Sequence, residues 1–569
     1  MDITVKIGGE AGQGIQTVGD LISQVCHSAG CYLLSVNDFE SRIRGGHSFL
    51  QIRVSDAPIT APSHRVALLV ALNQETYDLH KQELDSDGVI LLNAPENGVE
   101  KNVVRLDIDA LAREAGGKIT ANTVAAGAVL SLIGADFQIL ETLLTRRFES
   151  KGDGVVKMNV SAAKLGYESM SGVDFAPKTD MKNGSPKGKL ITGSKAAALG
   201  ALAADCRFSA FYPMSPATGI IVAFDSFSDD FPIVTEQAED EIAAMNMIIG
   251  ASYAGVRSMT ATSGGGFCLM TEALGLAAMA ETPVVVINAQ RPGPATGLPT
   301  RTSQGDLLFA INASQDEFPR FVFAPGDPHE IFETMIRAFH LSDKYQAPAI
   351  VLMDQYLCGS SFIAKKPFNV PEKIERFITT DDQIENPSEY QRFALTPDGV
   401  SPRVLPCAGQ ALLLATGNEH LEDGHISEDK INRKKMVEKR LAKLSGMKEE
   451  MRAPETFHEG AELMLVSWGS TNGAVKEAAL ALKATKGVDV GCMNLVDIWP
   501  FPGEQVAEIL SKSRCFVVVE CNSYAQLGKL IAQETGAQYD HAVLKYDGRP
   551  IYPVDILNGL TDAGLVEKK

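Results

Sequence analysis

The sequence lacks the features of a nucleic-acid-binding or membrane protein. Its 569 residues carry 52 lysines and arginines against 71 aspartates and glutamates, a formal net charge of -19. A nucleic-acid surface needs clustered cations, so this balance argues against one, and an anionic ligand must be met by local arginines and backbone amides. No apolar stretch is long enough to span a bilayer, which leads us to expect a cytoplasmic protein that acts without a membrane.

Disulfide and metal-binding patterns are also missing. The nine cysteines are dispersed, with no Cys-x-x-Cys pair, so neither a disulfide framework nor an iron-sulfur or zinc site is indicated. His420, Glu422, Asp423 and His425 have the composition of a metal site. Loops rich in histidine and acid are more often solvated, so we predict a solvated loop here and no metal ligand in the chain.

The dinucleotide-binding fingerprint Gly-x-Gly-x-x-Gly is missing from the first glycine-rich turn. Gly8-Gly9-Glu10-Ala11-Gly12-Gln13-Gly14 stands instead between a predicted strand and a predicted helix, where free amides and the helix dipole attract phosphate or carboxylate. The pattern supports an anion site and a plain tight turn equally. Arg42 and Arg44 can supply cations to the same anion, or they can form surface salt bridges.

The patterns that are present predict an α/β protein with three parallel-sheet domains, at residues 1–177, 190–366 and 456–569. Short apolar strands alternate with helical segments in each, as in parallel sheets with crossover helices. Predicted strands include Thr4–Gly9, Ser258–Thr262, Val284–Ala289, Phe321–Phe323 and Cys515–Val519. We predict a linker at residues 178–189 and a surface connector at residues 367–455, with a solvated charged helix from Ile431 to Lys448.

Glu241 is the first candidate for a functional residue. It follows Glu236, Glu239 and Asp240, and the macrodipole alone explains acids in a first helical turn. Beyond Glu241 the helix becomes apolar, so this carboxylate stands nearest the buried end, where desolvation raises its pKa and suits it to carrying a proton. Both interpretations stay open at this point.

Arg291 is the matching candidate for holding an anion. It closes the predicted strand Val284–Ala289 and precedes the rigid turn Pro292-Gly293-Pro294. Ligands of parallel sheets bind at the carboxyl ends of strands, where a guanidinium can grip a carboxylate with two hydrogen bonds. A structural arginine that holds the following loop, Gly297 to Gln304, is equally consistent with the pattern.

Four motifs of the middle part together resemble the alpha subunit of the 2-oxoacid:ferredoxin oxidoreductases. They are Tyr212-Pro213-Met214-Ser215-Pro216, Ala238-Glu239-Asp240-Glu241-Ile242-Ala243-Ala244, Ala261-Thr262-Ser263-Gly264 and the stretch from Gln290 to Thr302. The first part is similar to the family's gamma domain, here fused ahead of alpha, and the last part to its transketolase-C-terminal-like domain. Three further motifs are most similar to the 2-oxoglutarate branch: Gly417-Asn418-Glu419-His420, Gly424-His425 and Lys545 to Pro550.

The resemblance implies that this chain supplies the pyrimidine-binding half of a thiamine diphosphate site. Glu241 matches the acid that hydrogen-bonds the aminopyrimidine ring, and residues matched near the cofactor are Tyr212, Pro213 and Gly264. Residues matched around the 2-oxoacid are Ser215, Arg291 and Thr300. Candidates near the phosphates of coenzyme A (CoA) are Gly12, Gln13, Gly14, Arg42 and Arg44. Met214 and Ser215 replace the family's isoleucine and threonine, which weakens any inference of substrate preference from that turn.

The magnesium half of the cofactor site is expected elsewhere. In this family it needs a Gly-Asp-Gly and a distant asparagine, which Gly152-Asp153-Gly154 and Asn183 match in letters. A charged segment precedes this motif, so we predict a surface turn and not a metal site. The resemblance then implies that Mg²⁺ and a 4Fe-4S cluster lie on a separate beta subunit, without which this chain is inactive.

The resemblance implies an enzyme that converts 2-oxoglutarate, CoA and oxidised ferredoxin to succinyl-CoA, carbon dioxide and reduced ferredoxin, or runs the reverse reaction. Its expected partners are the beta subunit, in a dimer of alpha-beta heterodimers, and ferredoxin. Pyruvate or indolepyruvate is the alternative substrate. From a different class, a non-catalytic module that binds acyl-CoA or a nucleotide is the alternative function.

Overall fold

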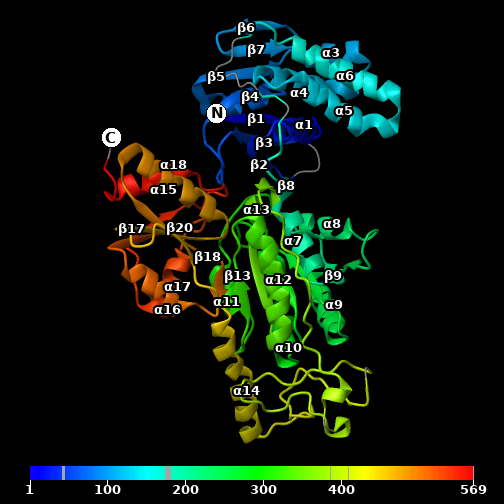
Figure 1. Cartoon of the computed structure of the whole chain (residues 1–569), viewed down its shortest axis with the longest axis vertical. Coiled ribbons are helices and arrows are strands. Elements are labelled where there is room, and N and C mark those ends of the chain that lie inside the picture. The colour runs from blue at the N-terminus through cyan, green and yellow to red at the C-terminus, as the bar shows by residue number, and fades with distance from the viewer. Residues whose placement is uncertain (42–44, 174–180, 183, 385, 408, 568–569) are drawn as a thin grey trace. The chain divides into compact units, whose positions relative to one another are not determined.

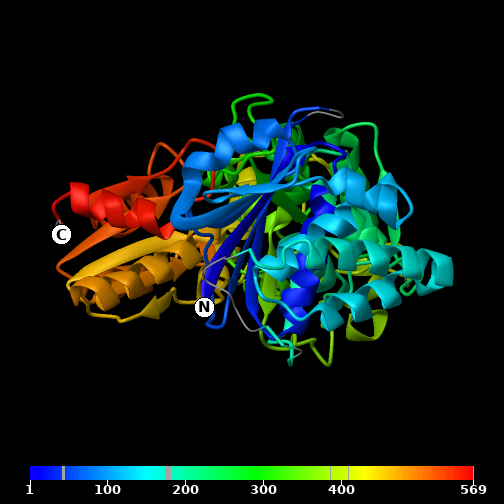
Figure 2. The same ribbon diagram turned by 90° about the horizontal axis from the view of Figure 1, so that it is seen from above.

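The computed structural model describes residues 1–41, 45–173, 181–182, 184–384, 386–407 and 409–567, and it divides into two compact units (Figure 1, Figure 2). Unit 1 comprises Met1–Ile191, Ser360–Pro367 and Tyr552–Val554, and unit 2 comprises Thr192–Gly359, Phe368–Ile551 and Asp555–Lys569. Three residues named from the sequence, Arg42, Arg44 and Asn183, lie outside the described residues. The predicted five-part division of the chain stays a prediction.

Unit 1 is built on a nine-stranded sheet in the order β6-β7-β5-β4-β1-β3-β2-β15-β8. Its strands are β1 (Asp2–Glu10), β2 (Tyr32–Phe39), β3 (His47–Ser55), β4 (Val66–Ala71), β5 (Leu84–Asn93), β6 (Gly98–Glu100), β7 (Val103–Leu106), β8 (Lys189–Thr192) and β15 (Ser361–Ala364). Strands β1, β4, β5 and β7 run parallel, whereas β3 pairs antiparallel with both β1 and β2. All inner residues of β1 are buried, the pattern of a strand covered on both faces.

The helices of unit 1 pack through glycines at their closest point. They are α1 (Ile15–Ser28), α2 (Gln74–His80), α3 (Ile108–Ala115), α4 (Ala121–Leu132), α5 (Phe137–Phe148) and α6 (Asp153–Glu168). A Cβ at Gly127 of α4 would lie 2.1 Å from the Ala163 carbonyl oxygen, and one at Gly166 of α6 would lie 2.0 Å from that of Val124. Only glycine therefore allows α4 and α6 to approach this closely.

Unit 2 contains two further sheets, in the orders β10-β9-β11-β12-β14-β13-β19 and β16-β18-β17-β20-β21. The first has β9 (Phe208–Phe211), β10 (Val234–Gln237), β11 (Ser258–Thr262), β12 (Val285–Gln290), β13 (Phe321–Phe323), β14 (Ala349–Asp354) and β19 (Asp497–Trp499). The second has β16 (Glu455–Phe457), β17 (Leu463–Trp468), β18 (Val490–Leu495), β20 (Cys515–Glu520) and β21 (His541–Leu544). Paired strands run parallel except at β19 and β16.

Helices flank these sheets, and the mainly parallel arrangement confirms the predicted α/β class. In the first half of unit 2 they are α7 (Gly193–Ala203), α8 (Thr218–Asp225), α9 (Glu241–Tyr253), α10 (Gly264–Met279), α11 (Leu307–Asn312), α12 (Pro328–Tyr345) and α13 (Gln355–Gly359). In the second half they are α14 (Lys430–Glu449), α15 (Asn472–Lys486), α16 (Gly503–Ser511), α17 (Gln526–Thr535) and α18 (Pro553–Asp562).

The charged helix α14 is anchored by buried ion pairs, so the prediction that it is solvated is wrong for the face that carries them. Lys439 Nζ donates to Glu281 Oε1 at 2.5 Å and Lys443 Nζ to Glu281 Oε2 at 2.7 Å, and none of the three side chains is more than 1% exposed. Glu281 follows α10, 158 residues before Lys439 in the chain. The charge pattern resembled a solvated face because the counter-charge comes from a distant segment.

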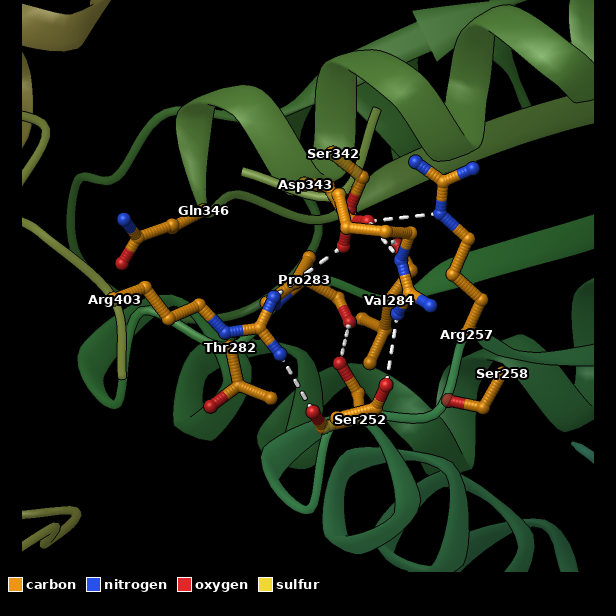
Figure 3. Close-up of polar contacts among 12 residues, drawn as sticks. Ser252, Arg257, Ser258, Thr282, Pro283, Val284, Ser342, Asp343, Gln346 and Arg403 are labelled. Carbon is orange, nitrogen blue, oxygen red and sulfur yellow. Dashed lines mark hydrogen bonds and ion pairs between the residues drawn. The ribbon is translucent and has the colours of Figure 1, made fainter. Parts of the chain in front are cut away.

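A second buried ion cluster fixes the earlier part of the connector (Figure 3). The carboxylate of Asp343, on α12, accepts hydrogen bonds from Arg257 Nε at 2.8 Å and from Arg403 Nη1 at 3.4 Å. Arg403 Nη2 also donates to the carbonyl oxygen of Ser252 at the end of α9. Because breaking a buried pair leaves an uncompensated charge, this cluster holds the connector firmly against α9 and α12.

Among the residues that the structure describes, no helix has both the length and the apolar character that crossing a membrane requires.

Candidate functional site

The predicted site residues lie where four neighbouring strands of unit 2 end. Strands β10, β9, β11 and β12 are consecutive in the sheet and parallel. Tyr212 and Glu241 follow β9 and β10, and Gly264 and Arg291 follow β11 and β12. The carboxyl ends of parallel strands form the edge at which ligands of open α/β sheets bind. The fold therefore gathers residues from four separate segments at one edge.

Glu241 begins α9, and its carboxylate is buried. The capping role belongs to Asp240, whose side chain accepts a hydrogen bond from the Ala243 N–H at 2.8 Å. Glu241 is 2% exposed, and its Oε1 atom has no hydrogen-bond partner. Burial raises the pKa of this carboxyl group, Asp240 adds to the rise, and the Arg291 guanidinium opposes it. Because Glu241 does not cap the helix and its Oε1 atom has no partner, this carboxyl group is available to a ligand.

A glycine of α10 allows the Glu241 carboxylate to take this position. A Cβ at Gly266 would lie 2.1 Å from Thr262 Oγ1 and 2.5 Å from Glu241 Oε1. Both distances are far below van der Waals contact, so any side chain here would displace the carboxylate. Gly266 thus sets the place of Glu241 at the N-terminal end of α10.

Arg291 and Ser215 are in direct contact. Arg291 Nη1 donates to the Ser215 carbonyl oxygen at 2.7 Å, which joins the turn after β9 to the turn after β12. Both residues are half-buried. Burial lowers the pKa of Arg291 and Glu241 raises it, so the guanidinium and the buried carboxylate act on each other electrostatically.

The other predicted residues of this edge differ in exposure. Tyr212 is 40% exposed and Pro213 is also exposed, whereas Thr300 is buried in the loop that follows Arg291. Gly264 begins α10, and a Cβ there would lie 2.5 Å from Asp306 Oδ2. Gly264 thus gives Asp306 the same close approach to α10 that Gly266 gives Glu241.

Three polar residues at this edge were not predicted from the sequence: Ser263, Asn288 and Asp306. Asn288 Nδ2 donates to Asp306 Oδ2 at 3.1 Å, while Asn288 Oδ1 and Ser263 Oγ are buried without a partner. Burial raises the pKa of Asp306. The signal that could have found Asn288 was an amide inside an apolar strand, because a buried unpaired amide lowers stability unless a ligand or water satisfies it.

The N-terminal glycine loop of unit 1 is a turn with its own internal hydrogen bonds. Gly14 precedes α1 with a φ of 78°, and Gly12 has a φ of 97°, left-handed values that favour glycine. Gln13 Oε1 accepts from the Glu10 N–H at 2.7 Å and from Asn73 Nδ2 at 3.1 Å. The Gln13 amide oxygen is therefore already bonded within the chain, once inside the turn and once to the residue before α2, and a CoA role for this loop stays a prediction.

No group of three or more His, Cys, Asp or Glu side chains is placed to hold a metal ion, within the part of the chain that the structure describes. Asp153 is exposed at the start of α6, and helix α5 and a short 3-10 turn precede it in place of a strand. The prediction of a solvated loop is wrong for His420, which is fully buried with its ring 4.0 Å from that of Phe393. His425 is exposed, beside Asp423.

Family models match three segments of the chain. Residues 199–439 match the thiamine diphosphate-binding part of pyruvate flavodoxin/ferredoxin oxidoreductase. Residues 4–169 match pyruvate ferredoxin/flavodoxin oxidoreductase, and residues 461–556 match core domain II of pyruvate:ferredoxin oxidoreductase. The segment with the thiamine diphosphate-binding match contains Glu241, Arg291 and the carboxyl edge described above.

Similar proteins cover nearly the whole chain. The 2-oxoacid:ferredoxin oxidoreductase subunit alpha of Saccharolobus solfataricus is 32% identical over 98% of this chain and 97% of its own length. The 2-oxoglutarate oxidoreductase subunit KorA of Mycobacterium tuberculosis is 28% identical over 92% of this chain and 86% of its own length. A solved 2-oxoglutarate:ferredoxin oxidoreductase from Magnetococcus marinus, with 2-oxoglutarate, coenzyme A and succinyl-CoA bound, has a TM-score of 0.90 and 31% identity over 99% of each chain.

Proposed function

Because the chain belongs to the 2-oxoacid:ferredoxin oxidoreductases as an alpha subunit, we propose that its substrate is 2-oxoglutarate. The reaction joins 2-oxoglutarate to CoA as succinyl-CoA, releases carbon dioxide and passes two electrons to ferredoxin, or runs in reverse. One observation supports a catalytic role for this chain above all others. Glu241 keeps a buried carboxylate oxygen without a partner at the carboxyl edge of the sheet.

The residues at this edge fit thiamine diphosphate, the cofactor of the family. An aminopyrimidine ring presents nitrogen acceptors and an amino donor. Three buried atoms of this edge have no hydrogen-bond partner and could bond such a ring: Glu241 Oε1, Ser263 Oγ and Asn288 Oδ1. Buried polar atoms without partners lower stability, so a group of them at one edge is consistent with a site in which a bound ligand supplies the missing hydrogen bonds. When bound, the cofactor supplies the electron sink that lets a carboxylate leave as carbon dioxide.

Two side chains have distinct tasks in this proposal. The raised pKa of Glu241 favours its protonated form, and a protonated carboxyl group can donate a hydrogen bond to a ring nitrogen. Arg291 binds the carboxylate of the 2-oxoacid. Its Nη1 bond to the Ser215 carbonyl oxygen fixes the direction of the guanidinium, and buried Thr300 shapes the adjoining loop.

The choice of 2-oxoglutarate follows the relatives. The Mycobacterium tuberculosis protein is named for 2-oxoglutarate, and the Magnetococcus marinus structure holds 2-oxoglutarate and succinyl-CoA. The family models are named for pyruvate, so pyruvate, and with it indolepyruvate, is the competing substrate. CoA is the proposed acyl acceptor in either case.

We assign the remaining components to a beta subunit, as the resemblance implies: Mg²⁺, the 4Fe-4S cluster and the contact with ferredoxin. Three helices around the site support a partner chain. Helices α8, α9 and α10 are mostly apolar, and they leave Val222, Ile242 and Leu269 exposed by 68%, 49% and 48%. Exposed apolar residues on neighbouring helices around a site mark a surface for a partner, so we propose that the beta subunit covers these faces.

The test is to copurify this chain with its beta subunit and measure dye reduction by 2-oxoglutarate, pyruvate and indolepyruvate. We expect the highest kcat/KM with 2-oxoglutarate and, in the Glu241→Ala complex, a rate lowered by about 10²- to 10⁴-fold, the usual contribution of a positioned proton carrier. Glu239→Ala, which changes an exposed acid two positions earlier, is the matched control and should keep the wild-type rate.

Two results would contradict the proposal separately. Wild-type turnover in the Glu241→Ala complex would remove this residue from the chemistry. A higher kcat/KM with pyruvate would leave the site in place and replace the substrate.

A further inference from the structure

The loop that carries Thr300 is bonded along its length to the last part of unit 2. We call residues 297–306 the substrate loop, since it follows Arg291 and contains Thr300. It leaves the site under tight backbone packing: Gly297 has a φ of 54°, and a Cβ there would lie 1.8 Å from the Pro292 carbonyl oxygen. The loop then crosses to the carboxyl ends of β17 and β20, two paired parallel strands of the five-stranded sheet.

Gln304 is the centre of this attachment. It is fully buried, and its side-chain Nε2 donates to the Trp468 carbonyl oxygen at 2.7 Å. Its Oε1 accepts from the Cys521 N–H at 2.8 Å, and its own N–H donates to the Cys521 carbonyl oxygen at 2.8 Å. Asn522 Nδ2 donates to the Gln304 carbonyl oxygen at 3.1 Å. Every polar group of Gln304 is therefore bonded either to Trp468, which ends β17, or to Cys521 and Asn522, which follow β20.

Neighbouring contacts continue the attachment on both sides of Gln304. The Thr302 N–H donates to the carbonyl oxygen of Gly548 at 3.2 Å. Gln526, a half-buried residue at the start of α17, donates through Nε2 to the Gly305 carbonyl oxygen at 2.7 Å and accepts from the N–H of Leu308, just past the loop, at 3.0 Å. The loop is thus held at three points by a part of the chain that supplies none of the proposed site residues.

We propose that Gln304 is a positioning residue, through which the five-stranded sheet sets the place of the substrate loop and with it the affinity for the 2-oxoacid. The inference rests on the proposed function, because it takes Arg291 and Thr300 as the residues around the substrate. Gln304 itself touches neither the substrate nor the cofactor. Gln304 acts on the geometry of the site, because a buried amide whose polar groups are all hydrogen-bonded holds the loop in a single conformation.

A shortened side chain tests this proposal. In Gln304→Asn the amide can no longer reach both Trp468 and Cys521, so the loop should loosen without the loss of a charge. In the complex with the beta subunit we expect the KM for 2-oxoglutarate to rise about tenfold or more, with kcat within about threefold of wild type, because misplaced binding groups weaken substrate binding. Hydrogen exchange of the backbone amides at residues 298–306 should become faster.

The matched control is Gln346→Asn. Gln346 is also a buried glutamine whose Nε2 donates to a backbone carbonyl oxygen, that of Ser401 at 2.6 Å, but it lies outside the substrate loop. Its φ of 49° is one that asparagine tolerates. We expect a lowered melting temperature in this variant, with an unchanged KM and unchanged exchange at residues 298–306.

Three outcomes decide between the explanations. A wild-type KM in Gln304→Asn, with only a lowered melting temperature, would overturn the proposal and make Gln304 a packing residue. If Gln304→Asn does not fold, Gln526→Ala removes one contact of the loop, at Gly305, and one just past it, at Leu308, from a half-buried position, and should raise the KM by about two- to threefold; an unchanged KM there would also overturn the proposal. Absence of turnover with any 2-oxoacid in the wild-type complex would instead overturn the proposed function. In that case unchanged hydrogen exchange at residues 298–306 in Gln304→Asn would show that Gln304 does not hold the substrate loop in place.

Discussion

The two ends of helix α10 hold buried carboxylates in opposite circumstances. At its N-terminal end Glu241 has an oxygen without a partner, and burial raises its pKa. Past its C-terminal end Glu281 is bonded to both Lys439 and Lys443. Burial alone would raise the pKa of Glu281, but Lys443 and Lys439 hold it well below its ordinary value. One acid is fully compensated within the chain and the other is not.

The difference separates a stabilising arrangement from a functional one. A paired acid that follows a helix beside two cations fixes α14 and the connector in place. An unpaired buried acid lowers stability, and it persists where a ligand completes it. The comparison predicts that neutralising the two acids has effects of opposite sign on stability, and the following variants test it from the largest expected effect to the smallest.

Glu281→Gln should be the most destabilising of these changes. It leaves two buried ammonium groups facing a neutral amide, and removing one partner of a buried ion pair typically lowers the free energy of unfolding by about 3–5 kcal/mol. Urea titration of the purified chain measures this loss. Since Glu281 lies at the far end of α10 from Glu241, the KM for the 2-oxoacid should stay at its wild-type value in whatever complex still assembles. A loss below about 1 kcal/mol would show that the cluster carries little stability.

Gly266→Ala should lower both stability and turnover at the other end of the helix. The new Cβ would lie 2.5 Å from Glu241 Oε1, and overpacking of this kind costs about 1–3 kcal/mol. Displacement of the carboxylate should lower turnover by about 10- to 100-fold. Gly275→Ala is the control on the same helix, because its Cβ would meet only Ser314 Oγ at 2.8 Å, a hydroxyl that can rotate away. Equal turnover in both variants would contradict the placement of Glu241.

Much of the fold could be predicted because strand periodicity is local. The strands Ser258–Thr262 and Phe321–Phe323 have the predicted bounds, and Val284–Ala289 is shifted by one residue. Strands β3 and β15 were not predicted. They pair antiparallel with β2, and β15 lies more than 300 residues from it in the chain, which no local pattern reports. The family resemblance, carried by short motifs, is confirmed over nearly the whole chain.

The site was predictable where it follows from strand order. Glu241 was named because it opens a helix that becomes apolar, and Arg291 because it closes a predicted strand at the edge where ligands of parallel sheets bind. The roles proposed for them stay predictions. Asp306 and the attachment of Gln304 were not foreseen, because both depend on how a loop folds back over α10 and the second sheet. The solvated interpretation of α14 was wrong for its buried face for the same reason, since Glu281 is distant in sequence.

Glu241→Gln should increase stability while it lowers turnover by about 10²- to 10⁴-fold. The raised pKa means that the folded chain binds the Glu241 proton more tightly than the unfolded chain. The resulting loss of stability is therefore small at acid pH, grows as the pH rises through the unfolded pKa, and is complete above the folded pKa. Glutamine carries no charge and has no such loss, so the variant should melt above wild type at pH 8 and together with it near pH 4. A lower melting temperature at pH 8 would show that the charged carboxylate is stabilised by the fold.

Lys439→Met should change the pH dependence of stability more than it changes the stability at any one pH. Burial lowers the pKa of Lys439 to about 8, although Glu281 opposes the shift. The folded chain therefore holds this proton less tightly than the unfolded chain, where the pKa of lysine is about 10.4. The penalty is fully present below about pH 8 and is relieved toward about pH 10. Wild type should thus gain stability relative to Lys439→Met between these pH values, as measured by urea midpoints at each pH. Lys434→Met, which changes an exposed lysine of the same helix, should show no such gain, and equal slopes in the two variants would contradict a buried ammonium at Lys439.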